Sequence, residues 1–239
     1  MISLVLPAYN EEKRISKSLD ALVSYMESSF GEGEYEILVV DDGSQDNTRK
    51  IVSQREDKNL VLFSYEQNRG KGGAVKYGVE QAKGDIIVFT DADLAYPPES
   101  IGLAKELIEK ENYDVILGSR EVADIGHKYP WYRTIMSCIF SFVVDAILDL
   151  NVPDTQCGFK AFKKDAAKII FEKVTLNGWG FDVELIFLAK KYKKSIGRMS
   201  VKLFHENSGS KIRILHDAVS MLREVKAIKK NDSLGLYDL

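Results

Sequence analysis

Asp91 and Asp93, one residue apart, are the side chains of this sequence best suited to carry chemistry. They follow a short apolar run, residues 86–89, and alternate side chains of an extended chain share a face, so both carboxylates can point at one spot. Two carboxylates this close repel each other unless a cation lies between them. Mg²⁺ commonly takes only one or two protein carboxylates and completes its shell with phosphates. The pair therefore predicts a site for Mg²⁺ or Mn²⁺ and a diphosphate, with a solvated Asp-x-Asp turn as the alternative.

The elements around this pair alternate between strand and helix. Branched and aromatic runs predict strands, and apolar residues at helical spacing predict helices between them. Such alternation predicts an α/β fold with a mostly parallel, Rossmann-like sheet flanked by helices. In these sheets the carboxyl ends of the strands meet at one edge, where ligands bind. The predicted strands of this half cover residues 2–6, 35–40, 60–65, 86–89 and 113–118.

The second half of the chain is less regular. It contains no internal repeat, low-complexity segment or clear linker, so we expect residues 1–239 to form a single domain whose C-terminal part is elaborated by amphipathic helices. Its predicted helices cover residues 131–150, 182–192 and 211–230, and its predicted strands cover residues 159–162 and 197–204.

Composition excludes several classes of protein. A net charge of −3 gives no basic bias toward nucleic acid, and 45% hydrophobic with 29% charged residues is ordinary for a soluble domain. Cys138 and Cys157 are interpreted as reduced thiols, and the three histidines lack the spacing of metal ligands. The apolar run at residues 2–6 is too short for a signal peptide, and no run reaches the roughly 20 residues of a membrane span. We therefore expect a cytoplasmic protein.

Three other strand-end loops carry functional side chains. Tyr9 could stack on a nucleobase and Glu11 could accept a hydrogen bond from a base or ribose, although a helix-start turn capped by Asn10 explains the same residues. Asp42 follows the second strand, where acids often hold ribose hydroxyls, with a tight turn as the alternative. Lys71 lies among glycines and could contact a phosphate, but the spacing fits neither a Walker A loop nor a dinucleotide-binding fingerprint.

The order of these motifs carries more weight than any one of them. Pro-Ala-Tyr-Asn-Glu, Val-Val-Asp-Asp-Gly-Ser, Asn-Arg-Gly-Lys-Gly-Gly-Ala, Asp-Ala-Asp and Gly-Ser-Arg follow one another as in the family 2 glycosyltransferases, which this chain resembles over roughly residues 2–215. Residues 154–160, 179–184 and 209–211 look most like the dolichyl-phosphate glucosyltransferases among the polyprenol-phosphate sugar synthases. The resemblance implies the GT-A fold, with a nucleotide-sugar-binding half at residues 1–120 and an acceptor-binding half at residues 121–239.

The resemblance also implies residue roles. Asp91 and Asp93 would bind Mg²⁺ or Mn²⁺ and the diphosphate, although Ala95 stands where mannose synthases often carry a further metal-binding glutamine. A catalytic or positioning carboxylate would come from Asp182, Glu184 or Asp154. Residues that would bind phosphate of the donor or acceptor are Arg120, Arg133 and Lys211. Residues that would contact the nucleotide sugar are Pro7, Ala8, Tyr9, Glu11, Asp42, Lys71, Asp91, Ala92 and Asp93.

The implied reaction is a metal-dependent, inverting transfer of glucose or another hexose from a nucleotide sugar, UDP-glucose in the first instance, to a polyprenyl or dolichyl phosphate. An acceptor phosphate is already ionised at neutral pH, so Asp182 would orient it where a hydroxyl acceptor would demand a general base. Transfer of mannose or GlcNAc, use of a soluble or glycan acceptor, and a non-catalytic sugar-nucleotide binding module are the alternatives.

A lipid acceptor raises the question of membrane contact. Residues 131–150 form a strongly apolar stretch, and residues 190–230 hold twelve Lys or Arg against three Asp or Glu. Both segments could lie peripherally on the cytoplasmic face of an anionic membrane. The alternatives are a buried core helix for the first segment and a solvated charged face for the second.

Overall fold

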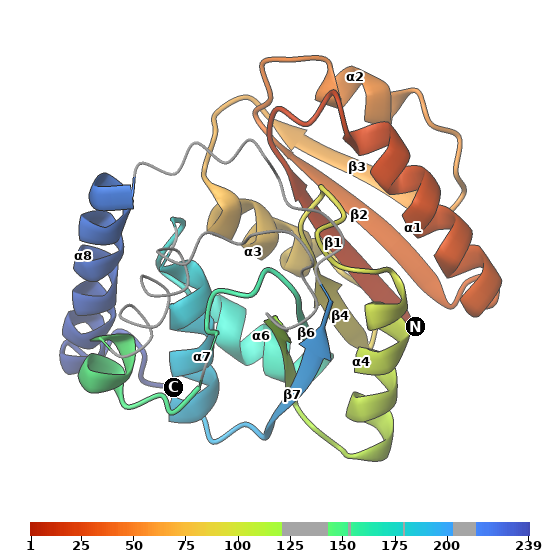
Figure 1. Cartoon of the computed structure of the whole chain (residues 1–239). Coiled ribbons are helices and arrows are strands. Elements are labelled where there is room, and N and C mark those ends of the chain that lie inside the picture. Colours follow the sequence, from red (N-terminus) through yellow and green to blue (C-terminus); the bar gives the residue numbers. More distant parts are fainter. Residues whose placement is uncertain (121–142, 153, 179, 203–213) are drawn as a thin grey trace.

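The computed structural model describes residues 1–120, 143–152, 154–178, 180–202 and 214–239 (Figure 1). Its strands are β1 Ile2–Ala8, β2 Tyr35–Asp42, β3 Leu60–Tyr65, β4 Ile86–Phe89, β5 Val115–Arg120, β6 Lys160–Lys163 and β7 Ile196–Val201. Its helices are α1 Ile15–Ser29, α2 Thr48–Ser53, α3 Lys71–Gln81, α4 Glu99–Lys110, α6 Lys164–Lys173, α7 Phe181–Lys191 and α8 Ile214–Ser233, and residues 143–148 are also helical.

The strands of the described residues form one mixed, seven-stranded sheet in the order β3-β2-β1-β4-β6-β5-β7. β1, β2, β3 and β4 are mutually parallel, and β5 and β7 are parallel to each other. β6 is the exception, because it runs antiparallel to both β4 and β5. The prediction of a mostly parallel α/β sheet is confirmed, and strands from both halves of the chain share it.

The strand order explains where a ligand site forms. The chain builds outward from β1 to β2 and β3 and then returns to place β4 on the other side of β1, which is a topological switch point. Because β6 is antiparallel, its first residue, Lys160, pairs with Phe89 at the carboxyl end of β4 and with Leu117 of β5. The start of β6 therefore reaches the same edge of the sheet as the ends of β1, β2 and β4.

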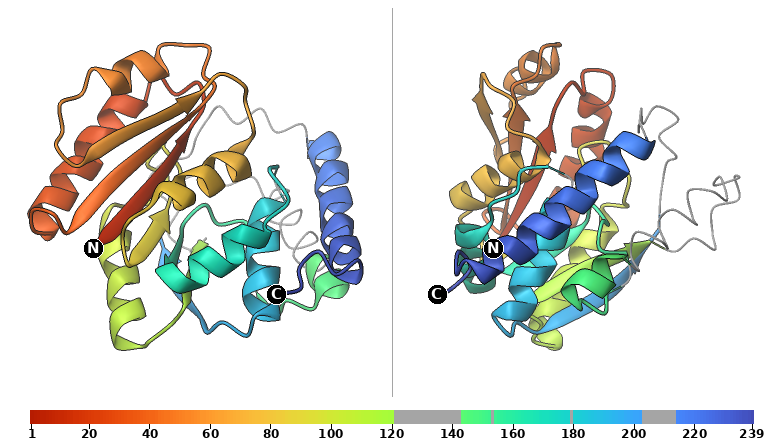
Figure 2. Two further views of the ribbon diagram at one scale, coloured as in Figure 1. Left: turned by 180° about the vertical axis from the view of Figure 1, so that it is seen from behind. Right: turned by 90° about the vertical axis from the view of Figure 1, so that its left-hand side faces the viewer.

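Helices cover both faces of the sheet (Figures 1 and 2). One core lies under α1, α2 and α4, and the other lies under α3, α6 and α7, with α8 packed outside α7. The strands feed both cores by alternation: Leu4 and Leu6 of β1 face the first core, whereas Val5 faces the second.

The differences from the predicted elements are local. β1 and β2 each run two residues further than predicted, so Asp42 is the last residue of a strand and not part of a loop. The helix α6 was not predicted, although Ala166, Ala167, Ile170 and Phe171 are buried at helical spacing. The alternative in which Asn10 caps α1 is wrong, because the residue preceding that helix is Arg14 and it makes no side-chain cap.

The apolar segment predicted as a helix over residues 131–150 is described only from residue 143. Its helical part ends at residue 148, and Val144, Leu148 and Leu150 are buried in the core under α7. This end of the segment belongs to the core. Within the described part of the chain, no helix combines the length and the apolar character that crossing a membrane requires.

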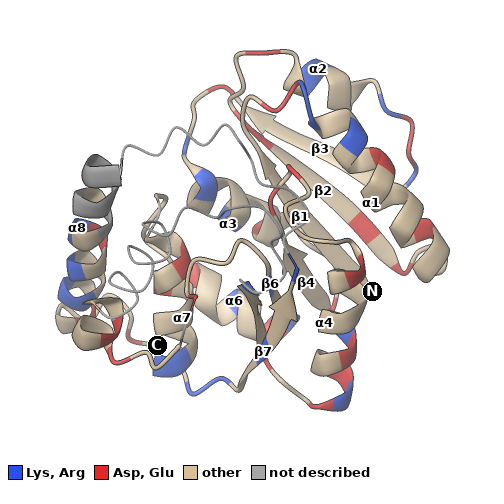
Figure 3. Cartoon of the chain, in the orientation of Figure 1, with Lys and Arg blue, Asp and Glu red and all other residues tan. Residues whose placement is uncertain are grey.

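The last helix is amphipathic, as predicted. Val225 and Ile228 of α8 are fully buried in the core beside α7. Arg223, Lys226 and Lys230 are exposed on the opposite side, so α8 presents basic groups to solvent (Figure 3). Part of the predicted basic region, however, holds the fold together: Lys190 donates to the backbone carbonyls of residues 149 and 150.

A buried carboxylate fastens the C-terminal tail to the core. Glu184 of α7 is 0% exposed and accepts hydrogen bonds from the backbone and hydroxyl of Thr175 and from the backbone N–H of Leu176. The hydroxyl of Tyr237, itself 0% exposed, donates to the same carboxylate at 2.5 Å. Burial, together with this carboxylate, raises the pKa of Tyr237 to about 12. The network therefore holds the loop before α7 and the C-terminal end of the chain together.

We expect Tyr237→Phe to lower the free energy of unfolding by about 2 kcal/mol, because it removes a buried hydrogen bond to a charged acceptor while keeping the ring. Urea denaturation followed by circular dichroism measures the effect. Tyr25→Phe is the matched control, since that ring packs edge-on against Phe30 and takes no part in the network. Equal stability of the two variants would contradict the structural role of the Tyr237 hydroxyl.

Candidate active site

A cleft of about 460 Å³ opens at the edge where β1, β2 and β4 end. This volume suits a small-molecule ligand. Every residue predicted to contact a nucleotide sugar contributes to its lining, together with Asp182 and four residues that were not predicted. The lining is formed by Pro7, Ala8, Tyr9, Glu11, Asp42, Asn68, Gly70, Lys71, Asp91, Ala92, Asp93, Asn177, Gly178 and Asp182.

The loop after β1 presents an exposed aromatic ring beside a carboxylate. Tyr9 is 43% exposed, and Glu11 is partly buried. Burial raises the pKa of Glu11, and its bidentate partner Arg14 only partly offsets this effect. The backbone N–H of Glu11 donates to the hydroxyl of Thr48, so the loop after β2 holds the loop after β1 in place.

Asp42 uses its carboxylate to organise the neighbouring loop. It accepts hydrogen bonds from the Tyr65 hydroxyl, from the Asn68 side chain and from the backbone N–H groups of Arg69 and Gly70. Gly70 has φ +85°, a conformation that glycine adopts without strain, and the next residue is Lys71 at the start of α3. Asp42 therefore positions Lys71. The predicted contact of Asp42 with the nucleoside stays a prediction.

The neighbouring carboxylate of Asp41 was seen in the sequence but not selected. It is 1% exposed, and its Oδ2 atom has no hydrogen-bond partner in the described structure, whereas Oδ1 accepts from the backbone of Ser44 at 3.3 Å. A buried polar atom without a partner costs free energy, and such an atom beside a cleft commonly awaits a ligand or water. Its burial follows from the register of β2 against β1, which sequence alone does not give.

Asp91 and Asp93 line the cleft just beyond the end of β4. Asp91 Oδ1 is 2.7 Å from Lys71 Nζ, and Asp93 accepts from the backbone N–H of Ala95 at 3.0 Å. Gly158 packs so closely against Asp91 that an added Cβ atom would lie 2.0 Å from Oδ2. Burial lowers the pKa of Lys71, but the nearby carboxylates outweigh it and raise that pKa above its usual value.

The donor set at this point fits a divalent cation such as Mg²⁺ or Mn²⁺. Two carboxylates from one loop are the hard oxygen ligands that these ions prefer. No group of three or more histidine, cysteine, aspartate or glutamate side chains assembles into a metal cage anywhere in the described ranges. A cation held by Asp91 and Asp93 would therefore draw its remaining ligands from water or from the phosphates of a bound nucleotide.

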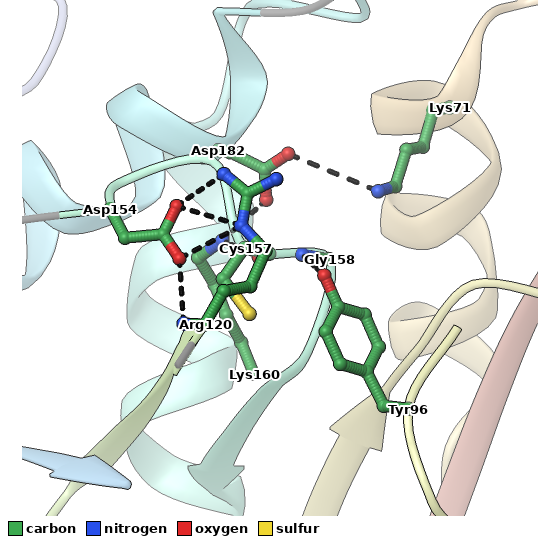
Figure 4. Close-up of polar contacts among 8 residues, drawn as sticks. All are labelled: Lys71, Tyr96, Arg120, Asp154, Cys157, Gly158, Lys160 and Asp182. Carbon is green, nitrogen blue, oxygen red and sulfur yellow. Dashed lines mark hydrogen bonds and ion pairs between the residues drawn. The ribbon is translucent and has the colours of Figure 1, made fainter. Parts of the chain in front are cut away.

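Asp182 lies between two lysines at the floor of the cleft (Figure 4). It occupies the first turn of α7 and is 6% exposed. Its Oδ1 atom accepts from Lys160 Nζ at 2.5 Å, and its Oδ2 atom is 4.0 Å from Lys71 Nζ. The chain of alternating charges Asp91, Lys71, Asp182 and Lys160 links the loop after β4 to α3, α7 and β6.

Arg120 and Asp154 form a second charged unit beside this chain (Figure 4). Asp154 accepts from the backbone N–H of Arg120 and from two guanidinium nitrogens. Burial lowers the pKa of Arg120, but the contact with Asp154 outweighs it and raises that pKa further above its usual value. Tyr96 is buried nearby and accepts from the backbone N–H of Gly158, which fixes the strand segment facing Asp91.

The remaining predicted site residues fall into three groups: those that line the cleft, those whose side chains are bound to other residues, and those outside the described part of the chain. Asp182 lines the cleft, whereas Glu184 lies outside its lining and its carboxylate is committed to the buried Thr175 and Tyr237 network, so we assign Glu184 a structural role in place of the predicted catalytic one. Asp154 is committed to Arg120. Arg133 and Lys211 lie outside the described residues.

Lys160 was missed as a functional candidate although it ends the quoted segment 154–160. A lysine inside a short apolar strand was the available signal, because burying an ammonium group is costly unless it has a partner. The loop before α7 was missed as well. The carbonyl of Asn177 accepts from the backbone N–H of Gly72 at 3.0 Å, so this loop braces the start of α3.

Comparison with known proteins gives the same picture. A family model described as "Glycosyl transferase family 2" matches residues 3–171. A dolichyl-phosphate beta-glucosyltransferase of Dictyostelium discoideum is 32% identical over 100% of this chain and 76% of its own length. One of Homo sapiens is 34% identical over 100% of this chain and 78% of its own.

Among solved structures, glucosyl-3-phosphoglycerate synthase from Mycobacterium tuberculosis, in complex with Mn²⁺ and UDP, superimposes with a TM-score of 0.70. The alignment covers 95% of this chain and 78% of the other at 22% identity, which supports the predicted GT-A fold. The family model, together with the relatives that match over the whole of this chain, shows that the chain belongs to glycosyl transferase family 2 and is a glycosyltransferase.

Proposed function

We propose that this enzyme transfers glucose from UDP-glucose to a polyprenyl phosphate of the dolichyl type, with inversion at the anomeric carbon. The observation that carries the proposal is the similarity, over the whole chain, to relatives named dolichyl-phosphate beta-glucosyltransferase. The cleft supports it, because its lining combines an exposed aromatic ring, paired carboxylates and a lysine.

The donor side of the cleft suits a uridine nucleotide. Tyr9 offers a ring on which a base can stack. Asp41, the neighbour of the cleft-lining Asp42, has a buried carboxylate oxygen without a partner in the described structure, and the imide N–H of uracil could donate to it. A guanine base presents an N–H donor too, so the choice of a uridine donor is supported by the solved neighbour that binds UDP and is tested below.

Asp91 and Asp93 would hold Mg²⁺ or Mn²⁺ in this proposal. When bound, such an ion neutralises the diphosphate and stabilises the charge that develops on it as it leaves. Lys71, 2.7 Å from Asp91, is placed to contact the same diphosphate. Lys71 would thereby favour breaking of the bond between the anomeric carbon and the diphosphate oxygen while the acceptor oxygen forms its bond to the same carbon from the opposite side.

Asp182 lies on the acceptor side, where its position suits orientation more than proton removal. The carboxylate of Asp182 is already engaged by cations, because Oδ1 accepts from Lys160 Nζ and Oδ2 lies 4.0 Å from Lys71 Nζ. An acceptor phosphate oxygen needs no deprotonation before it attacks the anomeric carbon. The residue therefore fits a phosphate acceptor better than an alcohol, and Arg120 and Asp154 border the same region.

Peripheral contact with the cytoplasmic face of a membrane would bring the enzyme to a lipid acceptor. The exposed Arg223, Lys226, Lys229 and Lys230 of α8 are the described groups that would meet anionic lipid. The helix that carries them is anchored to the core by Val225 and Ile228.

A transfer assay tests the proposed function. UDP-glucose, UDP-GlcNAc and GDP-mannose are each incubated with Mn²⁺ and a short polyprenyl phosphate, and release of nucleotide is compared with that from donor alone. We expect acceptor-dependent release of UDP from UDP-glucose. Acceptor-dependent turnover of another donor would change the assigned sugar, and no dependence on the lipid phosphate with any donor would overturn the assigned acceptor.

Asp93→Ala should abolish Mn²⁺-dependent turnover, at least a hundredfold loss, because it removes one of two carboxylates from the proposed ion site. Circular dichroism should show an unchanged fold. Asp165→Ala, which removes an exposed aspartate from the first turn of α6, is the control and should retain activity. Full turnover of Asp93→Ala would remove the basis for the metal assignment.

Gly158→Ala should weaken binding of Mn²⁺ with UDP about tenfold, since its new methyl group would collide with the carboxylate of Asp91 and displace it. Calorimetric titration measures this without turnover. Gly31→Ala is the matched control, because its nearest neighbour, 3.3 Å away, is the flexible side chain of Glu34. Equal affinity of both variants would show that the position of Asp91 does not matter for binding.

A further inference from the structure

Lys160 is an ammonium group placed inside the sheet. It opens β6, opposite Phe89 on one side and Leu117 on the other, and it is 1% exposed. Its Nζ atom lies 5.6 Å from the centre of the Phe89 ring and donates to the carbonyl of Cys157 at 2.8 Å. Burial of a charge at such a place costs several kcal/mol unless a partner compensates it.

The compensating partner is Asp182. The two side chains are 1% and 8% exposed, so water screens their contact weakly. A buried ion pair of this kind rarely stabilises a fold more than apolar side chains of the same volume would. Stability alone therefore does not explain why a lysine is buried at this position. Asp182, its partner, lines the cleft, which indicates a functional reason.

The problem that the pair solves is electrostatic. An acceptor phosphate is an anion, and it must approach a floor that already carries the carboxylates of Asp91, Asp93 and Asp182. Like charges this close repel each other strongly at the effective dielectric of a protein surface. Lys71 Nζ lies 2.7 Å from Asp91 Oδ1 and compensates that carboxylate. The same nitrogen is 4.0 Å from Asp182 Oδ2, so the charge of Asp182 is compensated mainly by another, closer cation.

We propose that Lys160 is a fixed counter-ion that cancels the charge of Asp182 and thereby admits an anionic acceptor to the cleft. This inference rests on the proposed phosphate acceptor. It makes Lys160 a positioning and specificity-determining residue that acts through Asp182, without touching the substrate. The same contact occupies Oδ1 of Asp182 with a hydrogen bond from Lys160, which suits an acceptor that brings no proton to remove.

The test compares Lys160→Met, Asp182→Asn and the double variant. Methionine keeps the unbranched stem and removes the charge. The measurements are the KM for a short polyprenyl phosphate, kcat, and binding of UDP with Mn²⁺ by calorimetry. Lys163→Met is the matched control on the same strand, because that lysine contacts Asn112 at the other end of β6.

We expect Lys160→Met to raise the acceptor KM about tenfold and to change nucleotide affinity less than threefold, because only the acceptor meets the uncompensated Asp182. Adding Asp182→Asn should return the acceptor KM to within about threefold of the wild-type value, while kcat stays low because the orienting carboxylate is gone. Lys163→Met should match the wild-type enzyme in every measurement.

A raised acceptor KM that persists in the double variant would overturn the proposal, since Lys160 would then act only as an anchor for the turn at residues 157–160. An unchanged acceptor KM in Lys160→Met would overturn it as well. If Lys160→Met fails to fold, the double variant, which buries no unpaired charge, is compared with Asp182→Asn alone: equal acceptor KM values support the counter-ion, and a higher value in the double variant opposes it. If the wild-type enzyme does not use polyprenyl phosphate at all, the assigned acceptor is overturned. The role of Lys160 as a counter-ion that admits this acceptor is then overturned as well.

Discussion

The alternation of negative and positive groups along the cleft floor is the interaction on which the rest of the site depends. Asp91, Lys71, Asp182 and Lys160 come from the loop after β4 and from α3, α7 and β6, so the chain of charges forms only when these four parts of the fold meet. The antiparallel insertion of β6 between β4 and β5 brings the last of them to the functional edge. A site assembled in this way is sensitive to the placement of every element that contributes to it.

Two buried carboxylates keep those elements in place. Asp42 binds the backbone of the loop that precedes α3, and Glu184 binds the backbone of the loop that precedes α7. The two loops then meet each other, because the carbonyl of Asn177 accepts from Gly72. At the same junction, Glu224 of α8 accepts from the backbone N–H of Gly180. The C-terminal helix and tail thus support the floor of the cleft although they lie outside the sheet.

Much of this arrangement can be predicted from the sequence, and there are physical reasons why the remainder cannot. The strand ends, the carboxylate pair and the family motifs identified ten of the fourteen residues that line the cleft. Glu184 and Asp182 cannot face the same cleft, because residues two apart on a helix are rotated by about 200° about its axis and point to nearly opposite sides. That geometry was available from the sequence. The partners of Asp42 and Lys160 were not available, since they depend on the strand register and on an antiparallel neighbour far along the chain.

The sign of the charge in the cleft bears on how a nucleotide diphosphate can bind there. The described lining holds five carboxylates, namely Glu11, Asp42, Asp91, Asp93 and Asp182, against the single ammonium group of Lys71. Arg14 and Lys160 compensate two of the carboxylates from outside the lining, which still leaves the floor negative. A diphosphate would be repelled from such a surface unless a cation entered with it. The residues that we propose to bind a metal ion are thus also those whose negative charge such an ion would offset, and this electrostatic argument supports the proposal independently of any relative.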